Sequence, residues 1–317
     1  MLSKVLDKSL NLGFNFKKEI NKFPEITLDF QNKNQMLKNF SFLTVFLYSF
    51  CYTQQQIQVL DAETQKPVPY AKLILRGKDY YRNTEENGET SLEQGEEILE
   101  IESFGFENLK VEKNQEIYLL KPKFVDIDEV KIAKSKSSKT FRIGKVTKEN
   151  TFYGVNNTIW MVAKKMKNYV SEEPLFVQSL KFYSRLYSKK SATIKVNIYY
   201  NENDIPGELY KSVIVTCFKN KKITEYIFPK SFLLPKEGII VGFEWILNQE
   251  NSYQKTMMMN GEKKEIIAHD PMIGSIKETP KNIIFGNLSD GGWKFVNGSN
   301  NINRSSGNLG IELKLTN

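Results

Sequence analysis

Glu244 is the residue best placed for chemistry in this 317-residue sequence, because it is a carboxylate inside the apolar run 239–247. A charge in such a run is costly to bury unless it is paired. In an extended strand, Glu244 faces away from Phe243 and Trp245. Two interpretations follow. Glu244 either hydrolyses a glycosidic bond with a second carboxylate about 5–10 Å away, or it meets a polar groove or a lysine of a neighbouring strand. We favour the second.

The single histidine, His269, restricts metal and triad chemistry. A zinc carboxypeptidase site needs two histidine ligands, so this sequence excludes that enzyme. A Ser-His-Asp triad around His269 would need a nucleophile elbow, which the sequence lacks. With two cysteines there is no Cys-rich zinc module or disulfide scaffold, and Cys217 lies in an apolar run that predicts a buried, inert thiol. We expect no catalytic residue, no metal and no cofactor.

Aromatic side chains form the other set of candidates, since sandwich folds hold oligosaccharides on Trp and Tyr platforms. The candidate ligand-binding residues are Trp245, Glu244, Tyr199 and Trp293. The competing interpretation places the aromatic residues in the core, where large rings dominate the packing energy.

These candidates lie in the region 151–317, whose pattern is that of β-strands. Residues 193–200 alternate cleanly, with Lys195, Asn197 and Tyr199 on one face, and residues 309–315 alternate as well. Only residues 158–169 offer a short helix as an alternative. About eight strands in this length predict a jelly-roll-like β-sandwich.

The charges divide the chain into two modules of opposite sign. Residues 54–120 hold 7 Lys and Arg against 14 Asp and Glu, whereas residues 121–317 hold 31 against 19. Residues 121–150 are rich in Lys and Ser and predict a linker. A basic balance of this size suits acidic polysaccharide, a membrane surface or nucleic acid, but no nucleic-acid recognition motif accompanies the lysines. Because these lysines are scattered along the chain, we favour a generic solvated surface.

The acidic module, residues 54–120, reads as short strands joined by turns, among them the tight-turn pair Asn87-Gly88. Over residues 57–132 the order of strands and turns resembles the carboxypeptidase-like regulatory domain of bacterial exported proteins. The matching positions are Pro67, Ala71, Thr84, Asn87, Gly88, Leu92, Gly105 and Phe106. The resemblance implies a small transthyretin- or Ig-like β-sandwich that is structural rather than catalytic.

The sequence predicts an export signal before both modules, with a buried core strand or helix as the competing interpretation of the same apolar run. Residues 40–52 carry no charge and follow Met36, Leu37 and Lys38. This run is too short to span a membrane and matches the apolar core of a signal peptide, which we assign to residues 36–53. Residues 1–35 are then an over-extended start or a disordered extension.

Together these features predict an all-β exported protein, located in the periplasm, at the outer membrane or outside the cell. We expect a non-enzymatic binding or cell-envelope structural protein whose second sandwich binds a glycan or an envelope protein. Neither a nucleic-acid partner nor a membrane span is expected. The alternative is a carbohydrate-active hydrolase with paired carboxylates.

Overall fold

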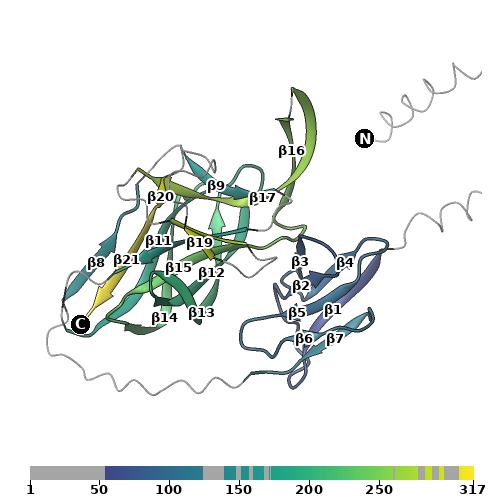
Figure 1. Ribbon diagram of the computed structural model, residues 1–317, viewed down its shortest axis with the longest axis horizontal. Helices are drawn as coiled ribbons and strands as arrows, with labels where there is room; N and C mark the ends of the chain where they lie inside the picture. Colours follow the sequence, from purple (N-terminus) through teal and green to yellow (C-terminus); the bar gives the residue numbers. More distant parts are fainter. Residues whose placement is uncertain are drawn as a thin grey trace, which may run out of the picture. The chain divides into compact units, whose positions relative to one another are not determined.

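The computed structural model describes residues 54–123, 139–147, 151–156, 160–167, 171, 173–259, 261–277, 283–287, 293–295 and 307–317. Within these residues every regular element is a β-strand, which confirms the predicted all-β class (Figure 1). No helix in the described part of the chain is long and apolar enough to cross a membrane. Residues 1–35, the predicted signal peptide 36–53 and residues 124–138 and 148–150 of the predicted linker lie outside the described residues.

Residues Gln54–Asn317 form one compact unit that contains two sandwiches. The first sandwich packs a three-stranded sheet against a four-stranded one. Their orders are β4 (Glu89–Leu92), β1 (Gln55–Asp61), β7 (Ile117–Leu120), and β3 (Tyr81–Asn83), β2 (Lys72–Leu75), β5 (Ile98–Glu102), β6 (Leu109–Lys110). Strand β1 runs antiparallel to β4 and parallel to β7. Alternate apolar side chains such as Val59, Leu73 and Ile101 fill the core between the sheets.

Gly88 allows the close approach of the β3–β4 turn to β1. Its backbone has φ of +75°, and a Cβ atom there would lie 2.7 Å from the carbonyl oxygen of Val59. The Asn87 side chain completes the turn by accepting a hydrogen bond from the amide of Glu89 at 3.0 Å. The predicted turn at Asn87-Gly88 is thus confirmed.

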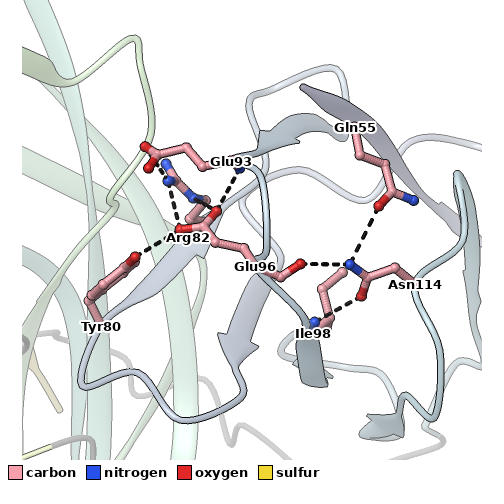
Figure 2. A network of polar contacts seen from close by, with 7 residues as sticks. All are labelled: Gln55, Tyr80, Arg82, Glu93, Glu96, Ile98 and Asn114. Carbon is pink, nitrogen blue, oxygen red and sulfur yellow. Dashed lines mark hydrogen bonds and ion pairs between the residues drawn. The ribbon is translucent and has the colours of Figure 1, made fainter. Parts of the chain in front are cut away.

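A polar network fixes strand β3 on the first sandwich, as Figure 2 shows. The guanidinium of Arg82 pairs with Glu96 and with Glu93, each at 2.8 Å, and the Tyr80 hydroxyl donates to Glu96. Asn114 adds a hydrogen bond to the carbonyl of Glu96 and accepts one from the amide of Ile98. Because successive side chains of a strand point to opposite faces, Tyr81 and Asn83 point away from the face on which Arg82 makes these contacts.

The second sandwich consists of a six-stranded sheet and an eight-stranded sheet. The six-stranded order is β13 (Ile205–Phe218), β12 (Ser191–Glu202), β15 (Ile239–Trp245), β10 (Trp160–Met166), β18 (Ile283–Asn287), β19 (Trp293–Phe295). The eight-stranded sheet contains β16 (Ser252–Met259), β17 (Glu262–Ile276), β11 (Leu175–Arg185), β21 (Ile311–Thr316) and β8 (Thr140–Gly144), with β14 (Ile223–Leu234), β20 (Asn308–Leu309) and β9 (Phe152–Val155) paired to its strands. Buried side chains from both sheets, such as Phe182 and Phe243, form its core.

Two local expectations are corrected by these strands. Residues 160–166, within the stretch that offered a short helix, form the central strand β10, which pairs with β15 and β18. Both faces of β10 are largely buried, so its sequence lacks the alternation of apolar and polar residues by which a strand is predicted. Strand β8 falls inside the predicted linker 121–150 but pairs with β21, so the second sandwich begins by residue 140.

The two sandwiches are joined by hydrogen bonds from β3 to the segment that follows β15. Asn83 exchanges two of them with Leu247: its amide donates to the Leu247 carbonyl, and its side chain accepts from the Leu247 amide. The Tyr81 hydroxyl donates to the carbonyl of Trp245 at 2.7 Å. The Glu85 carboxylate accepts from the side chain of Asn248 and from the amide of Gln249. These bonds position the first sandwich against the end of β15.

Cys217 tests the packing of the second sandwich. Its side chain is fully buried, and this burial raises the pKa of its thiol to about 11. We expect folded protein at pH 8 to leave Cys217 unmodified by iodoacetamide, because only roughly one thiol in a thousand is ionised there. Peptide mapping by mass spectrometry separates it from Cys51. Modification of native Cys217 within minutes would contradict the burial, and denatured protein supplies the positive control.

Candidate functional site

The outer face of the six-stranded sheet collects three of the four predicted site residues, namely Glu244, Tyr199 and Trp293. The register of β12 and β15 sets Lys195 opposite Glu244 and Tyr199 opposite Ile240. Because side chains alternate along a strand, Glu244 and Ile240 share a face with Lys195, Asn197 and Tyr199. This face, which we call the outer face, points away from the core of the second sandwich.

Aromatic rings cover the centre of the outer face. The rings of Tyr199 and Trp293 meet edge to face, with centroids 5.5 Å apart and an interplanar angle of 74°. Both residues are partly exposed and pack on the small cluster of Ala163 and Ile240. Gly242 leaves room for the ring of Tyr199, since a Cβ atom at position 242 would lie 3.3 Å from that ring.

Trp245 does not belong to this face, so its prediction as a ligand contact is wrong. It is 1% exposed and lies in the core, where its ring stacks on Trp160 at 5.5 Å. Its indole N–H donates to the carbonyl of Pro271 at 2.7 Å. The alternation that turns Glu244 outward turns Trp245 inward, and the buried indole then needs this polar partner.

Glu244 is the anion of a buried cluster that both sandwiches build. Its carboxylate pairs with the Lys72 ammonium of strand β2 at 2.7 Å and accepts a hydrogen bond from the Asn197 amide at 2.9 Å. Ser212 in turn donates to Asn197 at 2.7 Å, which fixes the orientation of the amide. Glu244 thus meets a lysine, but this lysine comes from the other sandwich and not from a neighbouring strand as expected.

The charged groups in this cluster shift one another's pKa values. Burial alone would raise the pKa of Glu244, but Lys195, Lys72 and the hydrogen bond from Asn197 outweigh it and hold that pKa at about 2. Burial opposes the charge of Lys72 as well, yet Glu244 and Glu102 raise its pKa. Lys195 has a lowered pKa because of burial, even though Glu244 lies near. Glu244 and Lys72 are thus a permanent ion pair at neutral pH.

A second carboxylate lies next to Glu244, as hydrolysis would require. The ammonium of Lys72 sits between the two, 2.7 Å from Glu244 and 3.5 Å from Glu102. Glu244 is 4% exposed, however, and its low pKa leaves it without a proton to donate. Glycoside hydrolysis needs one carboxyl group that is protonated near neutral pH and an open space between the pair. The geometry favours an ion-paired role for Glu244.

The side chains of His269 and Asp270 are both buried, in surroundings that point to a structural role. His269 is largely buried, and burial lowers its pKa to about 4. The Asp270 carboxylate accepts hydrogen bonds from the amides of Tyr187, Ser188 and Lys189, so it holds the β11–β12 turn. In the described part of the chain, no group of three or more His, Cys, Asp and Glu side chains could hold a metal ion.

The sequence did not predict Lys72 as the partner of Glu244, and it did not single out Lys195 and Asn197 as members of the site. Lys195 and Asn197 alternate with buried residues of β12, and this pattern did place them on the face of Tyr199. Lys72 has no comparable signal, because its partner is brought to it only by the packing of two sandwiches.

Comparisons with known proteins found no relative of this chain. No family model matches the chain, and neither the curated proteins nor the solved structures contain a significant match.

The ion pair yields a prediction for stability. Replacing Glu244→Gln leaves the buried Lys72 charge with only the more distant and more exposed Glu102 as its anion, and we expect the free energy of unfolding to fall by about 3 kcal/mol. Urea unfolding of the full chain measures this loss. The exposed control Glu208→Gln should change stability by less than about 0.5 kcal/mol. A double variant, Lys72→Met with Glu244→Leu, should recover most of the loss, whereas a loss equal to that of Glu244→Gln would contradict the pairing.

A pH dependence follows from the same group. Because the folded state holds the pKa of Glu244 at about 2, below its ordinary 4.5, its contribution is complete above pH 4.5 and is lost as the pH falls towards 2. The contribution is about 3 kcal/mol. Thermal unfolding between pH 7 and pH 2 should show a smaller acid-induced decrease for Glu244→Gln than for the wild type, and identical profiles would refute the assignment.

Proposed function

We propose that this chain is a non-enzymatic exported protein of the cell envelope that binds a glycan on the outer face of its six-stranded sheet. The observation that carries the proposal is the pair Tyr199 and Trp293, which lies partly exposed on this face instead of in the core. Aromatic rings offer apolar area to the C–H faces of sugars, and the adjacent, partly exposed amino group of Lys195 fits sugar hydroxyls.

Export is part of this proposal, and it rests on the uncharged run 40–52 with its Met-Leu-Lys start. The resemblance of residues 57–132 to the regulatory domain of exported proteins supports the same compartment. The first sandwich then acts as a structural support, because Lys72 and Asn83 attach it to the sheet that carries the aromatic pair.

Binding is preferred over hydrolysis because of the state of Glu244. The carboxylate with the best position for catalysis is buried, ionised and paired with Lys72. A protein partner on the same face is the second possibility within the binding class, and the experiment below separates it from a glycan.

A glycan array probed with the full chain tests the proposed binding. We expect specific spots, and Trp293→Ala should weaken the interaction with them at least about tenfold, the effect of losing about 1.4 kcal/mol of contact energy. The control is Phe104→Ala, which removes an exposed ring from the first sandwich and should change nothing. An array without any signal would refute glycan binding and favour a protein partner.

The export signal has its own test. Expression of the full reading frame with cell fractionation should place the protein outside the cytoplasm, and N-terminal sequencing of that fraction should begin close to Gln54. An exported chain that retains residues 1–35 would contradict the assignment of residues 36–53 as a signal peptide.

A further inference from the structure

A pocket of about 350 Å³ opens on the outward side of the eight-stranded sheet, where β14, β11 and β21 lie next to one another. The pocket is separate from the Tyr199–Trp293 face, which belongs to the other sheet. Its volume lies at the lower end of the range for small-molecule sites, about 300–1,000 Å³, which suits a ligand of one or two sugar units.

The pocket exists because the pairing of β11 with β14 is irregular. Ser179 pairs with Ile227, but Val177, two residues earlier, pairs with Phe232, so Gln178 alone stands against residues 228–231 of β14. Pro229 stands in this stretch, and it has no backbone N–H with which to continue the ladder. A bulge of this kind redirects side chains, and here it brings Gln178 and Ser231 to the pocket wall.

The polar groups of the wall leave one positive charge unmatched. The Glu225 carboxylate accepts a hydrogen bond from Ser179 at 2.9 Å and pairs with the Lys181 ammonium at 3.6 Å, so its charge is already balanced. Lys314 reaches the pocket from β21 and makes no ion pair with any described residue. A ligand with a carboxylate would supply the missing anion.

The remaining wall fits a sugar ring. Ile227 is 70% exposed and offers its apolar side chain to the pocket. The free lone pairs of Glu225, the Ser231 hydroxyl and the Gln178 amide can accept from and donate to ring hydroxyls. We propose that this pocket binds a uronic acid, with the carboxylate on Lys314, the hydroxyls on Glu225 and Ser231, and the ring face on Ile227.

The charge of the second module agrees with this ligand. Residues 121–317 carry 31 Lys and Arg against 19 Asp and Glu, a balance that draws polyanions to the surface. Such a field raises the local concentration of an acidic polysaccharide, and the pocket then recognises one of its sugars. The proposal goes beyond the glycan face of the six-stranded sheet and does not depend on it.

Saturation-transfer NMR on the full chain, titrated with sodium glucuronate, tests the proposal. We expect saturable binding, with D-glucose, which lacks the carboxylate, at least about tenfold weaker, as expected for one charge-assisted contact. Lys314→Gln should weaken glucuronate binding by the same factor and leave the weak binding of glucose unchanged. Ile227→Ser should weaken both sugars, because it removes the apolar wall.

The control variant is Lys263→Gln, which removes an exposed lysine from the β16–β17 hairpin, away from the pocket, and should bind glucuronate as the wild type does. Unchanged thermal midpoints for all variants exclude misfolding as the cause. Equal affinities for glucuronate and glucose, or unaltered binding by Lys314→Gln, would overturn the proposal. Tighter binding of free glutamate than of glucuronate would also overturn it, because the pocket would then select an amino acid.

Discussion

The buried negative charge of Glu244 is the constraint on which the arrangement of this protein depends. A carboxylate in the middle of an apolar strand must be neutralised, and the cation that does so, Lys72, belongs to the other sandwich. An ion pair of this kind adds little net stability compared with apolar packing, but it penalises every arrangement that separates the partners. Asn83 adds backbone contacts to the junction, since it exchanges two hydrogen bonds with Leu247 that are lost when the sandwiches separate. The junction is therefore specified by polar groups.

The signs of the charges at this junction are the reverse of those of the modules. The acidic module supplies the cation, and the basic module supplies the anion. Net charge describes the long-range field of a surface, whereas a buried contact depends on single groups and on their desolvation. The +12 balance of the second module consequently describes its long-range field and does not explain how the sandwiches are joined.

Periodicity in the sequence was sufficient for the all-β class and for the faces of β12, because alternation depends only on local geometry, whereas β15 was recognisable as a strand from its continuous apolar run. It failed at β10, where both faces are buried and no alternation remains. It could not find Lys72 as the partner of Glu244, since lysines are frequent and the contact joins distant parts of the chain. Nor could it find the pocket, which depends on the pairing of a strand interrupted at Pro229.

The parallel pairing of β1 with β7 has a mechanical consequence. Strand β1 opens the first sandwich and β7 closes it, and their register runs from Gln58 opposite Ile117 to Asp61 opposite Leu120. When tension pulls the chain in opposite directions from the start of β1 and the end of β7, the hydrogen bonds between these strands are loaded in shear, all at the same time. An antiparallel pair pulled from its two adjacent ends would instead open one bond after another. The first sandwich therefore resists tension between these two ends better than an antiparallel terminal pair of the same length would.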